Sequence, residues 1–344
     1  MSIPYRTRRR LQRFGSLCLF LLVLAVLAWL CWVIWVERYI IYTDDGATID
    51  FSLSAQLPYG EVAQPPAEGE GPNIHYNEGE NAVNTSTELL QLNGYYITSE
   101  LLQTDLENVK AKVSGLPTNT PVMIDVKSGF GSFFYSSELG EAVISQSVNV
   151  SEVDALIDLM NSKNLYLIAR IPSFQDYSFA LNHVNSGIPF TGGGGALWMD
   201  SEGCYWLKPK DSATVGWLTS IILELRGMGF DEVVLDEFIV PDSQRVIYDG
   251  DRVADLAETA GKLLTNCTTN SFTVSFNVNV VSFPLPEGRC RMYLSNIPAR
   301  DVELTASQAV ITDPQIRMVF IADSNDTRFD SYGVMRTIDL LDTE

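Results

Sequence analysis

Charged side chains interrupt otherwise apolar stretches of this chain at regular places. Five of them are Asp125, Lys127, Arg170, Asp236 and Glu237. Each belongs to a run rich in Val, Ile and Leu, where an ionised group is costly to bury unless it is paired. Every run carries its polar group at the same end, so we expect these side chains to meet at one face of the molecule.

Two carboxylic acids near one another are what hydrolysis of a glycosidic bond requires, because one protonates the leaving oxygen and the other attacks or activates water. Asp236 with either Asp125 or Glu237 could supply this pair, and Arg170 and Lys127 would lower the pKa of the acid that stays ionised. Adjacent strand residues point to opposite faces, so Asp236 and Glu237 enter one pocket only if the strand has ended. We therefore favour Asp236 as the principal carboxylate.

Structural roles are the alternative for the same residues. Asp236 and Glu237 could cap a loop or bind Arg170, and Asp125 with Lys127 could form an internal ion pair. Asn277 and Asp323 close later apolar runs and extend the candidate substrate-binding site.

A long segment, TGGGGALWMDSEGCYWLKP (191–209), adds aromatic rings near this face. They are Trp198, Tyr205 and Trp206. Flat rings at the mouth of a pocket suit stacking on sugar faces, so we predict that they bind substrate. The alternative is that they only cover the top of the domain.

The elements that must position these residues are short apolar runs alternating with amphipathic segments. The predicted strands are residues 94–98, 121–127, 165–171, 232–238, 272–278, 291–296 and 317–323. The predicted helices are residues 101–115, 150–164, 212–229 and 252–266. Strands that are apolar on both faces and alternate with helices imply parallel pairing. The remaining 251 residues from Gly94 to Glu344 suit a closed α/β fold, the (β/α)8 TIM-like barrel, in which strand C-terminal ends form the working face.

Strands five to eight of this barrel are expected to be irregular. Twelve residues separate the fifth and sixth runs, too few for a full helix, and the eighth strand near Tyr332–Ile338 is indistinct. A doubly wound open sheet is the alternative fold, although no Gly-rich phosphate turn follows any predicted strand.

The chain begins with a basic, then strongly apolar region. Residues 1–16 carry five arginines and no acid, and residues 17–36 are 20 residues without a charge. A helix of this length is about 30 Å long and spans a bilayer. The arginines predict a cytoplasmic tail and a single-pass anchor in the cell membrane, with the rest of the chain extracellular. A cleaved signal peptide is the alternative. Residues 37–93 then predict a strand at 47–56 and an acidic linker rich in Pro and Gly, before the 94–344 domain.

Composition limits the partners and cofactors. The net charge of −20 argues against a nucleic-acid-binding protein, which needs a basic face. The two histidines, His75 and His183, have no metal-ligand spacing, so we predict neither a metal site nor another cofactor. Outside the apolar run, Cys204, Cys267 and Cys290 leave the disulfide pattern open, with Cys267 and Cys290 as one candidate pair.

Several of these stretches resemble a bacterial glycoside hydrolase family that carries a domain of unknown function. They are GYYIT (94–98), VMIDVKSGFG (122–131), LYLIARIPSFQD (165–176), WMDSEGCYWLKP (198–209) and GFDEVVLDEFIVP (229–241). The family's signature after the fourth strand is an Asp, an aromatic residue and a Pro, and Asp236, Phe238 and Pro241 fit it. Asp125 and Arg170 fall on its polar strand-end positions. The resemblance implies a barrel of the α-amylase-like clan, often preceded by a membrane anchor.

The resemblance implies an activity and also raises two alternatives. It implies a glycoside hydrolase of the bacterial cell envelope that acts on a cell-wall or extracellular polysaccharide. The chain departs from the family at Lys208 and Asn277, where acids are usual, and Glu237 replaces an aromatic residue. An amide cannot act as acid or base, so an inactive glycan-binding barrel is one alternative, and an envelope scaffold is another.

Overall fold

The computed structural model describes residues 40–43, 46–49, 89–192 and 195–343. The chain divides into two compact units, Met1–Gly79 and Glu80–Glu344. In the first unit, β1 (Ile40–Thr43) pairs antiparallel with β2 (Gly46–Ile49), which covers the start of the predicted strand at 47–56. None of the helices in the described ranges is long and apolar enough to cross a membrane. The predicted span at 17–36 lies outside these ranges.

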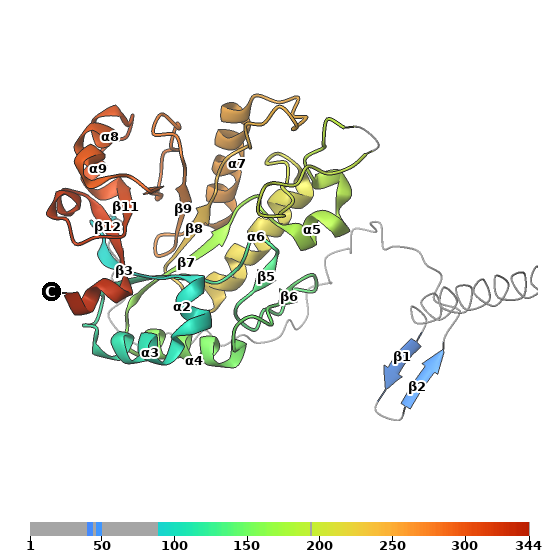
Figure 1. Ribbon diagram of the computed structural model, residues 1–344, viewed down its shortest axis with the longest axis horizontal. Helices are drawn as coiled ribbons and strands as arrows, with labels where there is room; N and C mark the ends of the chain where they lie inside the picture. The colour runs from blue at the N-terminus through green and yellow to red at the C-terminus, as the bar shows by residue number, and fades with distance from the viewer. Residues whose placement is uncertain (1–39, 44–45, 50–88, 193–194, 344) are drawn as a thin grey trace, which may run out of the picture. The chain divides into compact units, whose positions relative to one another are not determined.

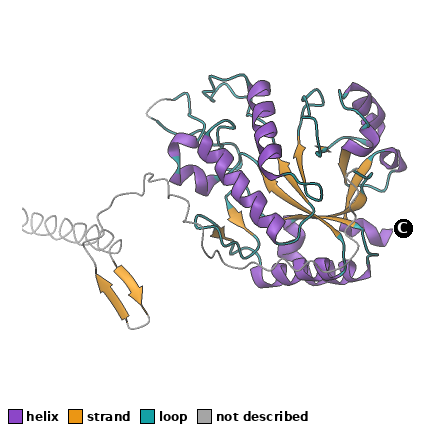
Figure 2. Cartoon of the chain, turned by 180° about the vertical axis from the view of Figure 1, so that it is seen from behind, coloured by secondary structure: helices purple, strands orange, loops and turns teal. Residues whose placement is uncertain are grey.

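In the second unit, eight parallel strands form a closed barrel and follow one another around it in chain order. They are β3 (Asn93–Ile97), β4 (Pro121–Asp125), β7 (Tyr166–Pro172), β8 (Glu232–Asp236), β9 (Thr273–Asn277), β10 (Met292–Ser295), β11 (Met318–Ala322) and β12 (Gly333–Thr337). The pairing of β12 with β3 closes the ring. The strands occupy the centre and the helices surround them (Figure 2). The predicted (β/α)8 barrel is confirmed, and the open sheet is wrong.

Helices cover the outside of the barrel (Figure 1). They are α2 (Ser99–Thr104), α3 (Leu106–Gly115), α4 (Val150–Ser162), α5 (Tyr177–Asn182), α6 (Ser212–Gly227), α7 (Arg252–Cys267), α8 (Val302–Gln308) and α9 (Pro314–Arg317). Asp211 and Asp251 accept hydrogen bonds from the first turns of α6 and α7, which fixes where these helices begin. The predicted helix at 101–115 is divided at Asp105 into α2 and α3.

The second half of the barrel is irregular, as predicted. No helix lies between β9 and β10 in the described chain, and the later connections use the short α8 and α9 and several 3₁₀ turns. These turns are η2 (Ala299–Asp301), η3 (Thr327–Ser331) and, after β12, η4 (Ile338–Thr343). The first half adds η1 (Val184–Ser186) and a small parallel pair, β5 (Ser132–Phe133) and β6 (Val143–Ile144).

Alternation along the strands separates an outer core from an inner one. One face of each strand packs under the helices, and the other fills the barrel. The inner cluster includes Met123, Ile168, Val234 and Met335. Asp125, Arg170 and Asp236 each come two residues after an inner residue, so they lie on the inner face at the C-terminal end of the strands. This register brings the predicted site residues to one mouth.

A polar network closes the opposite end of the barrel. Glu232, which is fully buried at the start of β8, pairs with Arg291 at 2.5 Å. Its carboxylate also accepts hydrogen bonds from Ser275 at 2.6 Å, Tyr166 at 3.0 Å and Tyr293 at 3.0 Å. A buried ion pair needs such additional donors to offset its desolvation. The network therefore serves as a structural plug at the N-terminal ends of the strands.

The three cysteines of the second unit are free thiols. Cys204, Cys267 and Cys290 are buried and form no disulfide. The candidate bridge between Cys267 and Cys290 is therefore not made in this structure.

Candidate functional site

Asp125 is fixed at the mouth by donors on three sides. The hydroxyl of Tyr96, on β3, lies 2.9 Å from both of its carboxylate oxygens. The backbone N–H of Ser99, at the start of α2, donates to Oδ2 at 2.8 Å, and Arg170 donates to Oδ1 at 2.9 Å. These contacts fix the position and orientation of the Asp125 carboxylate.

Arg170 joins this group to the next strand. Its Nη1 contacts Asp125 and also donates to the Tyr96 hydroxyl, while its Nη2 donates to Asp236 Oδ2 at 2.6 Å. Burial alone would lower the pKa of Arg170, but the charges of Asp236 and Asp125 raise it. The guanidinium therefore remains charged, and one cation holds two carboxylates in place.

Asp236 is held from its other side by Asn277. The Nδ2 of Asn277 donates to Asp236 Oδ1 at 2.5 Å and also lies 2.8 Å from the hydroxyl of Ser295. Both Asp236 oxygens therefore have a fixed partner, and the side chain is nine-tenths buried at the base of the mouth. Asn277 does not supply an acid; it orients one.

Glu237 differs from both aspartates. Strand β8 ends at Asp236, and Glu237 adopts a left-handed backbone conformation with φ of 48°. Such a conformation is strained for a residue other than glycine and is common at functional sites. Its side chain is exposed, and no described residue hydrogen-bonds its carboxylate. Desolvation and then the charge of Asp236 raise its pKa. Glu237 follows the end of the strand beside Asp236, but it is not among the residues that line the pocket described below, whereas Asp236 is.

Lys127 pairs with an aspartate other than Asp125. Its Nζ pairs with Asp176 Oδ2 at 2.9 Å, and both side chains are buried. Asp176 also accepts the backbone N–H of Phe179 at 2.9 Å and the indole N–H of Trp217 at 3.0 Å. The alternative of an internal ion pair between Lys127 and Asp125 is therefore not found, and Lys127 ties the end of β4 to the N-terminus of α5.

A pocket of about 290 Å³ opens over this arrangement. Its walls include Asp125, Lys127, Arg170 and Asp236 among the predicted residues, and Ser99, Phe130, Gln175, Glu202 and Cys204 among those not predicted. Asp323 is exposed beyond the end of β11 and does not line it. Among the residues of the described ranges, no three His, Cys, Asp or Glu side chains are grouped as metal ligands.

The three predicted aromatic residues lie in different surroundings. Trp206 is buried and donates its indole N–H to Asp200 at 2.7 Å. Tyr205 stacks on Tyr177 with 5.0 Å between the ring centroids. Trp198 lines a separate pocket. Burial of Trp206 agrees with the alternative that this ring covers the domain, whereas Trp198 remains open to a ligand.

Sequence reasoning missed Tyr96, Gln175 and Glu202. Tyr96 follows from the same alternation that gave Asp125, because it lies two residues after Gly94 on the inner face of β3. Gln175 and Glu202 reach the pocket from a loop, where no periodic signal indicates which way a side chain points.

Comparison with known proteins identifies the family. Residues 94–265, half of the chain, match the family described as "Putative glycosyl hydrolase domain". The chain belongs to this family. The match spans β3 to α7, and so includes Asp125, Arg170, Asp236 and Glu237 of this glycosyl hydrolase domain. A comparison with curated proteins finds no match.

Solved structures similar to this glycosyl hydrolase domain have low sequence identity. A hypothetical protein from Ruminiclostridium thermocellum is 19% identical with a TM-score of 0.45, over 53% of this chain and 96% of that chain. The GH36 alpha-galactosidase AgaA A355E from Geobacillus stearothermophilus is 10% identical with a TM-score of 0.47, over 72% of this chain and 39% of that chain. The galactosidase domain of alpha-galactosidase-sucrose kinase is 11% identical with a TM-score of 0.48, over 73% and 38%. The chain thus spans less than half the length of either galactosidase.

Proposed function

We propose that the barrel hydrolyses a cell-wall or extracellular polysaccharide, with Asp236 as nucleophile or base and Glu237 as proton donor. The observation that carries this proposal is the contrast between the two acids. Asp236 is held by the charged Arg170 and by Asn277, whereas Glu237 is unpaired among the described residues and its pKa is raised. A carboxylate held in place by a cation and an amide suits a nucleophile or base, and a carboxyl group with a raised pKa suits a proton donor.

Asp125 is a poor candidate for the proton donor. Its carboxylate accepts hydrogen bonds from Tyr96, Ser99 and Arg170, and these contacts occupy both of its oxygens. Asp125 instead fixes Arg170, which in turn orients Asp236. We therefore assign Asp125 a positioning role and leave proton donation to Glu237.

In the proposed reaction, a sugar lies over the mouth with its anomeric carbon near Asp236. Glu237 gives its proton to the glycosidic oxygen as the C–O bond breaks, and Asp236 either attacks the anomeric carbon or removes a proton from the attacking water. Arg170 and Asn277 keep Asp236 in a single orientation throughout. The pocket residues Phe130 and Gln175 are placed to contact the sugar.

The test compares the purified full chain with Asp236→Asn on a panel of polysaccharides, with new reducing ends as the readout. We expect Asp236→Asn to lower the rate at least a thousandfold, on the order of other catalytic carboxylates. The matched control is Asp323→Asn, which changes another aspartate at a strand end but outside the pocket, and should retain full activity. Equal activity of wild type and Asp236→Asn would remove Asp236 from the mechanism.

A glycan-binding barrel without activity is the second candidate. It is favoured by Asn277, an amide at the end of β9 where the family resemblance leads us to expect an acid. This alternative predicts saturable polysaccharide binding with no new reducing ends in wild type and in Asp236→Asn alike. The same panel therefore separates the two functions.

The proposal also places the barrel outside the cell, attached by residues 17–36. It is supported by the uncharged run of 20 residues and the five arginines before it. Protease added to intact cells should degrade the barrel domain. Protection of the barrel until the cells are lysed would contradict this location.

A further inference from the structure

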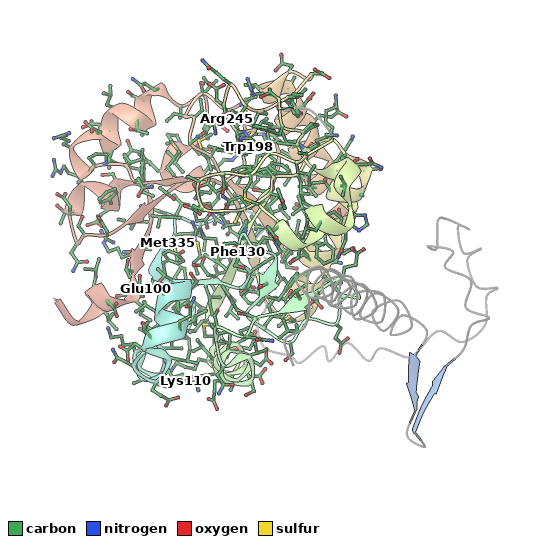
Figure 3. All side chains as sticks on the ribbon, turned by 45° about the vertical axis from the view of Figure 1, so that its right-hand side comes forward. Glu100, Lys110, Phe130, Trp198, Arg245 and Met335 are labelled. Carbon is green, nitrogen blue, oxygen red and sulfur yellow. The ribbon has the colours of Figure 1, made fainter. Side chains whose placement is uncertain are left out.

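A second pocket, of about 530 Å³, lies beside the loop that carries Trp198. Trp198 and Arg245 both line it, and they lie close together and apart from Phe130 of the catalytic mouth (Figure 3). Phe190 and Ser243 also line this pocket. None of the catalytic groups assigned above borders this pocket.

The second pocket offers the two kinds of surface that a sugar ring requires. Trp198 is half-buried, and its ring centroid lies 6.2 Å from that of the buried Trp206. Arg245 is exposed, and no described carboxylate pairs with its guanidinium. An aromatic face binds the apolar C–H face of a sugar, while a guanidinium and serine hydroxyls bind its hydroxyl groups. The pocket therefore suits a neutral carbohydrate ring.

Asp200 is the acid that lines the second pocket, and both of its carboxylate oxygens already accept hydrogen bonds from the protein. Its Oδ1 accepts the backbone N–H groups of Glu202 and Cys204, both at 2.9 Å. Its Oδ2 accepts Trp206 at 2.7 Å and Gln175 at 2.8 Å. These four donors leave the carboxylate with no free position for a cation, so it acts as part of the wall.

The same hydrogen bonds connect the two pockets. Gln175, Glu202 and Cys204 line the catalytic mouth, and each is bonded to Asp200 of the second pocket. An antiparallel bridge between Met199 and Tyr205 holds this segment as a tight hairpin. The hairpin at 199–205 is thus a single wall with one pocket on each side.

We propose that the second pocket is a distal subsite that binds another sugar of the same polysaccharide chain, across the 199–205 hairpin from the bond to be cleaved. This proposal rests on the proposed function and deepens it, because it assigns the enzyme to extended chains rather than to single terminal sugars. A chain held on both sides of the hairpin is cleaved within its length.

The test measures binding separately from cleavage. Affinity gel electrophoresis of the full chain uses hydroxyethyl cellulose, glycol chitosan, soluble starch and xylan as probes. The variants are Trp198→Ala, Trp198→Phe, Arg245→Met and Asp236→Asn, with Leu223→Ala, an exposed apolar residue on α6, as the matched control. Thermal unfolding of every variant verifies that the fold is kept.

We expect one probe to retard the wild type, Asp236→Asn and Leu223→Ala equally. Trp198→Ala should weaken retardation about tenfold, Arg245→Met should weaken it less, and Trp198→Phe should restore most of it. This pattern supports the subsite even if no variant cleaves any polymer, so failure of the hydrolase proposal is seen separately. Equal retardation of wild type and Trp198→Ala, or a wild type retarded by none of the four probes, would overturn the subsite.

Cleavage gives a second readout. With a cleavable polymer, we expect Trp198→Ala to lose more of its kcat/KM on the polymer than on a short oligosaccharide of the same sugar. A loss that is the same for both lengths would place Trp198 in the catalytic mouth and would contradict a distal subsite.

Discussion

At the scale of single residues, the two acids of the proposed reaction differ in their contacts: Arg170 and Asn277 hold the carboxylate of Asp236, whereas no described residue hydrogen-bonds Glu237. Desolvation, and after it the charge of Asp236, raise the pKa of Glu237 above its ordinary value. A proton donor must be neutral to act, and a nucleophile must be charged. Asp236 and Glu237 supply the two acids of the proposed reaction, so the amide of Asn277 is compatible with it.

This contrast predicts how activity depends on pH. A general acid is lost as pH rises through its pKa, and because the pKa of Glu237 lies above its ordinary value of 4.5, the alkaline limb of kcat/KM should lie above that value too. Glu237→Gln should remove this limb and lower the rate on natural linkages by about 10²–10⁴-fold. The same variant should hydrolyse aryl glycosides with a good leaving group, such as 2,4-dinitrophenyl, at a rate much closer to that of the wild type.

The matched control for Glu237→Gln is Glu202→Gln, which neutralises a neighbouring acid of the pocket. The charge of Glu202 contributes to the raised pKa of Glu237, so this variant should keep the alkaline limb but shift it to lower pH. An unchanged limb in Glu237→Gln would show that another group donates the proton.

The sequence predicts the central residues of the site because alternation along a strand is a strong signal. Asp125, Arg170 and Asp236 follow inner-face positions at a spacing of two, and the structure brings them together as ion pairs. The partner of Lys127 could not be predicted, because Asp176 comes from a loop and a helix start. The burial of Trp206 also depends on tertiary packing that no local pattern shows.

At the scale of elements, the Glu232 network connects the N-terminal ends of four strands, β7 to β10, and holds them in register. Arg291→Met removes the cation and leaves the carboxylate of Glu232 buried without its charge partner. We expect a loss of about 3–5 kcal/mol in the free energy of unfolding, measured by denaturant titration. Replacing both residues together with apolar ones should cost less, because no uncompensated charge remains. Equal losses in both variants would contradict this role.

The four predicted helices lie within a few residues of observed ones, whereas the break between α2 and α3 and the short helices α5, α8 and α9 were not predicted. The α6 and α7 segments match their predicted ranges because Asp211 and Asp251 mark their beginnings with side-chain hydrogen bonds. Asp105 interrupts the predicted 101–115 helix without any glycine or proline to announce it. The short link from β9 to β10 was predictable, because chain length alone excludes a helix there.

At the scale of the whole molecule, the family match ends before the fold does. Residues 94–265 stop within α7, whereas the barrel closes only when β12 pairs with β3. A chain ending at residue 265 should expose two open sheet edges and unfold without cooperativity, as measured by circular dichroism during denaturant titration. A chain beginning at Glu80 is the control and should unfold cooperatively, because the second compact unit begins there. Cooperative unfolding of the 1–265 chain would contradict this.

The three free cysteines of the barrel can be used to measure local unfolding, because each thiol is buried in a different part of the domain. Cys204 lies in the hairpin wall, Cys267 ends α7, and Cys290 precedes β10, and burial raises the pKa of all three thiols. Only a thiolate reacts quickly with an alkylating reagent, so each buried cysteine should be labelled slowly until local unfolding exposes it to solvent. In a chain whose Cys18 and Cys31 are replaced by alanine, mass spectrometry of labelled peptides would time the exposure of the loop, the helix and the strand individually. Ligands that hold the hairpin closed should delay the labelling of Cys204 alone.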